Sequence, residues 1–331
     1  MKLKLHLTVF TSVCFFLFAS VVSAAEEPTR EQVLEERMDY YINYSSHILP
    51  WYYLAAVDQY ERNIAQVRDD IPEREGIIAM QFTDDFWTGA LNPMKDDTDL
   101  NSIIFFDGNG SDGNLDGKAD RANDDDVMLT VSEYLTGFGP TEKDFERALK
   151  SYYERDASVK QIMTIAKIYK EFETLNLDEN AFPLALQANF SYRSTWGVSR
   201  GWGVRRMHEG TDLFASYGVP VKSTTYGLVE VMGWNDFGGW RVGIRDIHNT
   251  YHYYAHLSGF NKEIKEGDII EMGTVIGYVG SSGYGKEGTS GKFAPHLHYG
   301  MYKYNGRIEW AYNPYPSLVR WEQEERNAKK K

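Results

Sequence analysis

The chain has 331 residues, of which 42% are hydrophobic and 25% are charged. This composition is too apolar for a mostly disordered protein and too polar for a polytopic membrane protein, and the length suffices for two ordinary domains. The formal net charge of −13, from 35 Lys and Arg against 48 Asp and Glu, argues against a general nucleic-acid-binding protein. We therefore expect no nucleic-acid partner.

The charge is distributed unevenly along the chain. Residues 25–185 hold 15 Lys and Arg against 34 Asp and Glu, a net charge of −19, whereas residues 186–331 hold 18 against 14, a net charge of +4. The remaining +2 comes from Lys2 and Lys4. This asymmetry indicates two halves of different construction.

The first 24 residues have the pattern of a targeting segment. Lys2 and Lys4 precede the apolar residues 7–22, and small residues follow, ending at Ala24. This pattern is typical of a secretory signal peptide, here over residues 1–24, and it predicts export from the cytoplasm. The alternative is an uncleaved membrane anchor, which would attach the protein to the membrane through this segment alone.

The only cysteine, Cys14, lies inside this segment. After cleavage the chain would therefore contain no thiol. This excludes disulfide bonds, thiolate zinc sites and a cysteine nucleophile from the mature protein.

Apolar residues recur at three- and four-residue steps through five stretches of the first half. They predict helices over residues 31–46, 50–66, 124–134, 142–153 and 158–172. Asp124, Asp125 and Thr141 occupy positions where helix N-caps are expected. We therefore predict a helical domain over residues 25–175.

Glycine becomes frequent in the second half, where residues 201–300 hold 19 of the 29 glycines. Short β-branched and aromatic runs bounded by Gly, Asn or Asp occupy residues 227–232, 241–245, 251–255 and 275–279. Such runs are typical of an antiparallel β domain, which we place at residues 188–331 after a linker at residues 176–187. The sequence thus predicts a multidomain α plus β protein.

Six of the eight histidines lie between residues 208 and 298, and four of them belong to three clusters with neighbouring residues. The clusters are His208-Glu-Gly-Thr-Asp212, Tyr254-Ala-His256 and His296-Leu-His298. Residues two apart on a strand point to the same face, so both histidines of the last cluster reach one point. Two histidines and one carboxylate, with a fourth position left to water, are a ligand set typical of hydrolytic zinc sites.

The alternative for each single histidine is an ordinary buried or exposed side chain. We prefer that interpretation for His248 and His252, which match no comparable cluster. Gly210 favours a turn between His208 and Asp212, and a turn can still bring an imidazole and a carboxylate together. The other histidines, taken together, predict a metal site in the β domain.

The spacing His208-x-x-x-Asp212 followed by His296-x-His298 resembles that of the M23 family of zinc peptidases, the lysostaphin-like enzymes that cut bacterial cell-wall peptide. The similarity extends from Arg206 to His298. It includes Gly218-Val-Pro-Val221, Gly227-Leu-Val229, Tyr254-Ala-His256-Leu and Gly277-Tyr-Val-Gly280.

The resemblance implies a set of roles for five residues. His208, Asp212 and His298 would bind one zinc ion, and His256 and His296 would be the two catalytic histidines. Zinc polarises a scissile carbonyl and lowers the pKa of bound water. A histidine can take the water's proton and return it to the leaving amine, a step worth roughly 10²- to 10⁴-fold in rate.

Aromatic residues crowd the same region of the sequence. They include Trp234, Trp240, Tyr278, Tyr284 and Tyr299. We expect most of them in the core, with one or two lining a groove for sugar or peptide. The glycine-rich segment at residues 284–293 is predicted to be a mobile loop at the rim of this groove.

Residues 47–170 resemble, more faintly, lysozyme-like lytic transglycosylases. The resemblance rests on Pro50-Trp-Tyr-Tyr-Leu-Ala-Ala56, Met80-Gln-Phe82, Asp112-Gly-Asn-Leu-Asp-Gly-Lys-Ala-Asp120 and Ala148-Leu-Lys-Ser-Tyr-Tyr153. In those enzymes one glutamate protonates the glycosidic oxygen, and Glu61 occupies the matching place. The resemblance implies a lysozyme-like fold for the helical half.

Two departures from that pattern affect the expected role of Glu61. Arg62 replaces the small hydroxyl residue that usually follows the acid, and Ile78-Ala79 replaces the usual glycine context. An arginine beside the acid is expected to lower its pKa, which is unfavourable for a general acid. We interpret this half as a non-catalytic wall-binding or positioning domain, with glycan cleavage through Glu61 as the alternative.

Residues 84–126 hold 12 Asp against 3 Lys and Arg. Part of this segment follows the first half of an EF-hand loop, but Asn123 stands where the twelfth-position Glu is required. One interpretation is a solvated acidic loop. The other is a calcium site formed by Asp112, Asn114, Asp116 and Asp120.

The whole sequence predicts a secreted zinc metallopeptidase that hydrolyses a bond of peptidoglycan stem peptides. Its plan resembles that of the sporulation peptidases of endospore-forming bacteria, which implies cleavage between L-Ala and D-Glu in remodelling of the cell wall or spore cortex. The mildly basic second half suits an anionic substrate. The alternatives are a non-catalytic scaffolding or binding module of the M23 fold, and a lytic transglycosylase acting through Glu61.

Overall fold

The computed structural model describes residues 28–72, 74–200 and 206–330. The predicted signal peptide, with Cys14, lies outside the described residues. None of the helices in the described ranges combines the length and the apolar character that crossing a bilayer would require.

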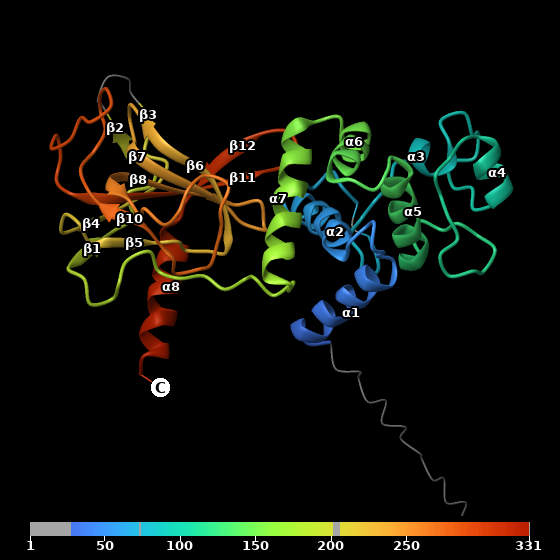
Figure 1. Cartoon of the computed structure of the whole chain (residues 1–331), viewed down its shortest axis with the longest axis horizontal. Coiled ribbons are helices and arrows are strands. Elements are labelled where there is room, and N and C mark those ends of the chain that lie inside the picture. The colour runs from blue at the N-terminus through green and yellow to red at the C-terminus, as the bar shows by residue number, and fades with distance from the viewer. Residues whose placement is uncertain (1–27, 73, 201–205, 331) are drawn as a thin grey trace, which may run out of the picture.

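Helices form the first half of the described chain, as predicted (Figure 1). They are α1 (Arg30–Asn43), α2 (Trp51–Ala65), α3 (Asp84–Thr88), α4 (Leu100–Phe105), α5 (Asp124–Gly137), α6 (Glu142–Tyr153) and α7 (Asp156–Phe172). The five predicted helices are present, and each end lies within three residues of its predicted position. The sequence did not predict α3 and α4, because helices of five and six residues are too short to show a helical repeat.

The helix starts follow local capping chemistry. Thr141 caps α6, as predicted, and its side chain and that of Asp144 each bond to the other's backbone N–H. The cap of α5 is Asn123, whose side chain accepts from the backbone N–H groups of Asp125 and Asp126. Asp124 and Asp125, which were predicted as caps, lie instead in the first turn, where carboxylates favour the positive end of the helix.

The core of the helical half surrounds α2, in which ten of fifteen residues are buried. Its buried carboxylate, Asp58, accepts hydrogen bonds from the Tyr41 hydroxyl at 2.5 Å and from Arg37 at 3.3 Å. It also accepts from the Ala79 backbone N–H at 2.5 Å. Because a buried carboxylate requires partners, Asp58 ties α1 and the segment after α2 to this helix.

An antiparallel sheet forms the second half, which confirms the predicted β architecture. Its strands are β1 (Phe190–Tyr192), β4 (Thr211–Ala215), β5 (Pro220–Lys222), β6 (Gly227–Asn235), β7 (Gly239–Arg245), β8 (Tyr251–Phe260), β9 (Ile269–Ile270), β10 (Val275–Val279), β11 (His296–Tyr304) and β12 (Glu309–Tyr312). The strand order is β1-β4-β11-β8-β7-β6-β9, with β10 joining β5 to β8 and β12 pairing with β11. A separate pair consists of β2 (Ser199–Arg200) and β3 (Arg206–Met207).

The chain ends in a helix that the sequence did not predict, α8 (Tyr315–Ala328). Only two of its residues, Leu318 and Trp321, are buried. A helix that buries so few residues shows only a weak apolar repeat in the sequence. Part of the segment predicted as a linker lies against it, because the Phe182 backbone N–H donates to the Glu325 carboxylate at 2.9 Å. The Phe182 side chain is fully buried in the core of the sheet half.

The two halves are packed directly together, with α7 lying beside the sheet (Figure 1). The Asn63 side chain of α2 donates to the backbone carbonyl of Ile247 at 2.7 Å. Ile247 and Tyr304, both from the sheet half, belong to the hydrophobic core of the helical half. The contact therefore includes shared core and is more than a surface contact.

The acidic segment is organised by bonds to its own backbone. Asp126 accepts from the backbone N–H groups of Gly113 and Asp120, each at 2.7 Å. Asp112 accepts from the Gly117 N–H at 2.8 Å. Among the described residues the aspartates predicted as calcium ligands do not bring three donor atoms together, so calcium binding receives no support.

Candidate active site

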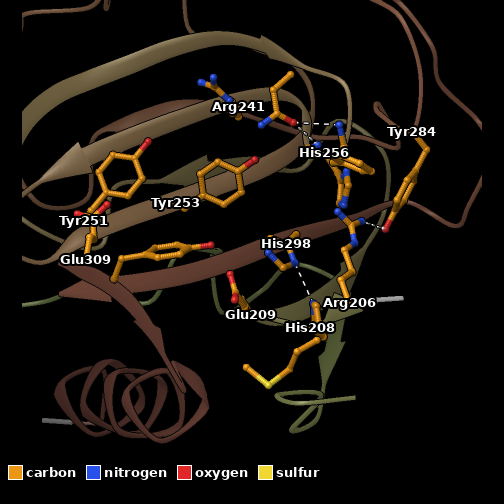
Figure 2. Close-up of a pocket in the computed structure, with 15 residues that line it drawn as sticks. Arg206, His208, Glu209, Arg241, Tyr251, Tyr253, His256, Tyr284, His298 and Glu309 are labelled. Atoms are coloured by element: carbon orange, nitrogen blue, oxygen red, sulfur yellow. Dashed lines mark hydrogen bonds between the residues drawn. The ribbon is translucent and has the colours of Figure 1, made fainter. Parts of the chain in front are cut away.

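His208, Asp212 and His298 meet on one face of the sheet, and Figure 2 shows the two histidines side by side. His298 on β11 lies directly opposite Asp212 on β4, and the turn after β3 carries His208. The His208 Nε2 atom lies 3.0 Å from His298 Nδ1 and 3.1 Å from Asp212 Oδ1, and the last two atoms are 3.0 Å apart. The turn expected at Gly210 thus does bring the imidazole and the carboxylate together.

The donor set fits a zinc ion. The ligand atoms of a tetrahedral zinc site lie about 3.4 Å from one another, since zinc–nitrogen and zinc–oxygen bonds are about 2.1 Å long. The three separations are close to this value. In the described part of the chain, this is the one group of three His, Cys, Asp or Glu side chains whose donor atoms converge.

Neighbouring groups orient two of these side chains. The His208 Nδ1 atom lies 2.8 Å from the Thr195 carbonyl, so it carries the proton and donates, and Nε2 is then the unprotonated nitrogen that can bind a metal. Gly210 lies against the His298 ring: a Cβ atom added there would come within 2.5 Å of the ring carbon Cε1. A glycine is therefore needed at this position because of a close approach.

His256 and His296 lie beside this group, and their ring centroids are 4.8 Å apart. His256 Nδ1 lies 2.8 Å from the Ser282 carbonyl, and His296 Nδ1 lies 2.8 Å from the Ala294 carbonyl. With Nδ1 donating, each ring presents Nε2 as a proton acceptor. The structure brings together all five residues that the sequence singled out.

His256 occupies a β-bulge. The register of β7 and β8 pairs Trp240 with Leu257 and Val242 with Tyr254, so Ala255 and His256 together face the single residue Arg241. The backbone φ of His256 is +62°, a left-handed conformation that is uncommon outside glycine. Bulges re-aim side chains, and this one turns His256 toward the site.

Burial and neighbouring charges shift the pKa values of the site. Burial by itself would raise the pKa of Asp212, but hydrogen bonds with His208 and His298 outweigh it and hold that pKa well below its ordinary value. Burial is the largest cause that lowers the pKa values of His298 and His256. His256 and His298 are therefore neutral at neutral pH.

A groove of about 420 Å³ runs along the sheet beside these side chains (Figure 2). In the register of β8 and β11, Tyr253 pairs with Gly300 and Tyr251 with Tyr302, so these tyrosines share the face of His298. The aromatic residues that line the groove are Phe237, Tyr251, Tyr253, Tyr284 and Tyr302. Of these residues the sequence singled out only Tyr284. The spacing of Tyr251 and Tyr253 on one strand indicates that both point to the same face.

The other aromatic residues named from the sequence do not line the groove. Trp234 and Trp240 pack edge to face, with centroids 5.3 Å apart, and Tyr299 is completely buried in the core. The predicted rim loop forms a wall of the site, because Tyr284 and Phe293 each place a ring against His256, at 5.8 and 4.6 Å.

The two histidines set aside in the sequence lie outside the site. His252 is buried, and its Nε2 lies 2.9 Å from Asp246 Oδ2 while its Nδ1 lies 2.7 Å from the Tyr299 hydroxyl. His248 Nε2 lies 2.7 Å from Asp178 Oδ1. Both have hydrogen-bonding partners that account for their positions.

Comparison with known proteins gives one match to the sheet half and one to almost the whole chain. The model of a family described as "Peptidase family M23" matches residues 206–310. An L-Ala–D-Glu endopeptidase of Bacillus subtilis (strain 168) is 54% identical over 322 residues, which cover 97% of this chain and 98% of that protein. This chain belongs to peptidase family M23. The predicted family is thereby confirmed, and the chain is a peptidase.

Lysostaphin matches a smaller part of the chain. Lysostaphin from Staphylococcus simulans is 34% identical over 114 residues, which cover 34% of this chain and 21% of lysostaphin. The solved catalytic domain of that lysostaphin is 31% identical and covers 40% of this chain and 93% of that domain, with a TM-score of 0.32.

The helical half of this M23 peptidase has a cavity of its own. It measures about 650 Å³, and Glu61 lines it among Tyr60, Tyr134, Tyr152 and Tyr153. The Tyr153 hydroxyl donates a hydrogen bond to the Glu61 carboxylate. Burial, reinforced by nearby Asp58, raises the pKa of Glu61 to about 7, against the opposing hydrogen bond from Tyr153.

The prediction that Arg62 lowers the pKa of Glu61 was wrong. Successive helical residues point about 100° apart, since a turn holds about 3.6 residues. Arg62 accordingly turns away and donates to Asp58 at 3.1 Å and to the Ile77 carbonyl at 2.7 Å. Its charge is engaged there, so desolvation decides the pKa of Glu61.

Replacing Gly210 by alanine tests the packing around His298. The Cβ atom would collide with the His298 ring, so we expect Gly210→Ala to weaken Zn²⁺ binding by roughly 10- to 100-fold, as changes around metal ligands do. The measurement is a Zn²⁺ titration against a competing chelator. Gly233→Ala is the matched control, because a Cβ atom there meets nothing within 4 Å. Equal zinc affinity in the two variants would contradict this account of Gly210.

The raised pKa of Glu61 predicts a pH-dependent stability. Between pH 4.5 and about 7 the folded chain binds a proton that the unfolded chain has lost, so this group makes stability fall as pH rises through that window. We expect Glu61→Gln to remove this fall. We expect the unfolding free energy of the variant minus that of the wild type to increase by about 2–3 kcal/mol between pH 4.5 and pH 8. Urea titrations at the two pH values measure this difference. The exposed Glu146→Gln is the control, and parallel pH profiles for all three proteins would refute the assignment.

Proposed function

We propose that this M23 peptidase is a secreted zinc endopeptidase that hydrolyses the L-Ala–D-Glu bond of peptidoglycan stem peptides. The observation that carries the proposal is the 54% identity, over 97% of this chain, to a protein named for that bond. The convergence of five suitable side chains in a groove supports it. In this proposal His208, Asp212 and His298 hold the zinc ion.

A bound zinc ion would polarise the scissile carbonyl. It would also lower the pKa of a water molecule toward neutrality, so that the water can lose a proton and attack this carbonyl. His256 and His296 are the proposed catalytic histidines. Each has Nδ1 held by a backbone carbonyl, so Nε2 is positioned to accept the proton of the attacking water. The same nitrogen can then deliver that proton to the departing amine of D-Glu. The low pKa of His256 keeps its Nε2 unprotonated before the reaction.

We also propose the setting in which the enzyme works. Residues 1–24 would direct export, and the helical domain of residues 25–175 would hold the peptidase domain of residues 188–331 on the wall through the connector at residues 176–187. The resemblance to sporulation peptidases supports a role in the spore cortex or cell wall.

The proposed reaction is tested on purified peptidoglycan. The wild-type enzyme is expected to release fragments with D-Glu at the new amino terminus, identified by mass spectrometry. A chelator or His298→Ala should reduce this release by at least about 10³-fold, because the zinc site loses its ion or a ligand. His248→Ala, outside the site, is the matched control. Full activity after zinc removal, or a different new amino terminus, would overturn the proposal.

We propose a second function for the helical half, cleavage of the glycan strand with Glu61 as the general acid. Its supporting observation is the pKa of about 7, which leaves a large fraction of Glu61 protonated near neutral pH. The tyrosines around it provide a surface on which sugar rings pack. The alternative for this half remains wall binding without catalysis, for which the same cavity would serve as a binding site.

The two roles of the helical half differ in their products. If Glu61 is a general acid, digestion of purified wall yields anhydro-sugar ends, and Glu61→Gln abolishes them while His298→Ala does not. Reductive analysis of the released glycans detects these ends. Their absence from wild-type digests, or their persistence in Glu61→Gln, would exclude this catalytic role.

A further inference from the structure

Strand β7 carries two arginines on the groove face, and their environments differ. Arg245 donates to Glu230 at 2.8 Å and to Glu309 at 2.8 Å, so two carboxylates neutralise its charge. Arg241 lines the groove four residues earlier on the same strand. Within the described ranges no carboxylate lies within ion-pairing distance of it, and its buried Nη1 atom has no hydrogen-bond partner. Arg241 therefore brings an uncompensated positive charge to the groove.

The position of Arg241 is set by the bulge that carries His256. Arg241 is the one residue of β7 that lies opposite Ala255 and His256. Neighbouring strands are about 4.8 Å apart, a distance that an arginine side chain exceeds. Figure 2 shows Arg241 beyond Tyr253 on the groove side of the sheet, on the strand next to the one that carries His256. Arg241 and His256 thus line the same groove from neighbouring strands.

The other charged residues of the groove are differently engaged. The Arg206 guanidinium donates to the Tyr284 hydroxyl at 3.1 Å and lies 4.3 Å from the ring centroid of Phe237, so neutral groups hold it in place. Glu209 is exposed to solvent, and Glu309 is paired with Arg245. Burying part of a guanidinium without a partner is unfavourable, and an anion supplied by the substrate would remove that cost.

We propose that Arg241 binds the free α-carboxylate of the D-glutamate next to the scissile bond. This assignment rests on the proposed cleavage between L-Ala and D-Glu. The α-carboxylate is attached to the carbon that bears the scissile nitrogen, so the cation that binds it must lie near the groups that protonate the leaving amine. Arg241 satisfies that requirement through its position opposite His256. A planar guanidinium can form two parallel hydrogen bonds with a carboxylate, which a neutral amide cannot accept in the same way.

The experiment compares two stem peptides that differ only at this group, one with D-glutamate and one with its α-amide. We expect the wild-type enzyme, loaded with zinc, to cleave the carboxylate peptide with a kcat/KM roughly 10- to 100-fold higher. Arg241→Gln should lose most of this preference, because cleavage of the carboxylate peptide falls and that of the amide peptide changes little. Arg241→Lys should keep part of it, since the charge remains but the paired geometry does not.

Equal loss on both peptides in a variant with normal zinc content and thermal unfolding would make Arg241 a structural residue and overturn the assignment. Loss of the preference in Arg206→Gln but not in Arg241→Gln would overturn it in favour of Arg206. Cleavage between L-Ala and D-Glu without any carboxylate preference would overturn the role of Arg241 alone, whereas cleavage at another bond would overturn the proposed function and this role with it.

Discussion

The pairing of β11 between β4 and β8 is the constraint on which the site depends. It sets His298 opposite Asp212 on one side and opposite Ala255 on the other. Because side chains alternate along a strand, a slip of one residue would move His298 into the core and bring Leu297 or Tyr299 to the groove. The register is fixed by that same core, since Leu297 and Tyr299 are completely buried on the opposite face.

The bulge in β8 adds a feature that regular pairing cannot supply. In an unbroken ladder Ala255 and His256 would point to opposite faces. The extra residue and the left-handed backbone of His256 let this side chain join the groove face beside His298. The unfavourable backbone conformation is held by the pairing on both sides of it and by the bond from the His256 N–H to the Gly238 carbonyl at 2.7 Å.

Burial raises the pKa of two carboxylates of the same chain, but the net shifts are opposite. Asp212 lies among imidazoles that hydrogen bond to its charged form, and its pKa falls. Glu61 lies among tyrosines, with a single hydrogen bond from Tyr153 and the negative charge of Asp58 nearby, and its pKa rises to about 7. Burial prevails at Glu61, whereas at Asp212 the hydrogen bonds and charges of the histidines outweigh it. One chain thus holds an ionised carboxylate beside two imidazoles and a carboxylate that is partly protonated near neutral pH.

The sequence by itself determined the local features: the five helices with their apolar repeats, the antiparallel sheet, and the spacing of His208, Asp212, His256, His296 and His298. These follow from periodicity, turn residues and a motif read along the chain. The tertiary structure decided the direction of Arg62, the tyrosines of the groove, the isolation of Arg241 and the burial of Glu61. Each of these depends on which side chains approach from distant strands and helices, and charge, desolvation and packing act through space between residues that lie far apart in sequence.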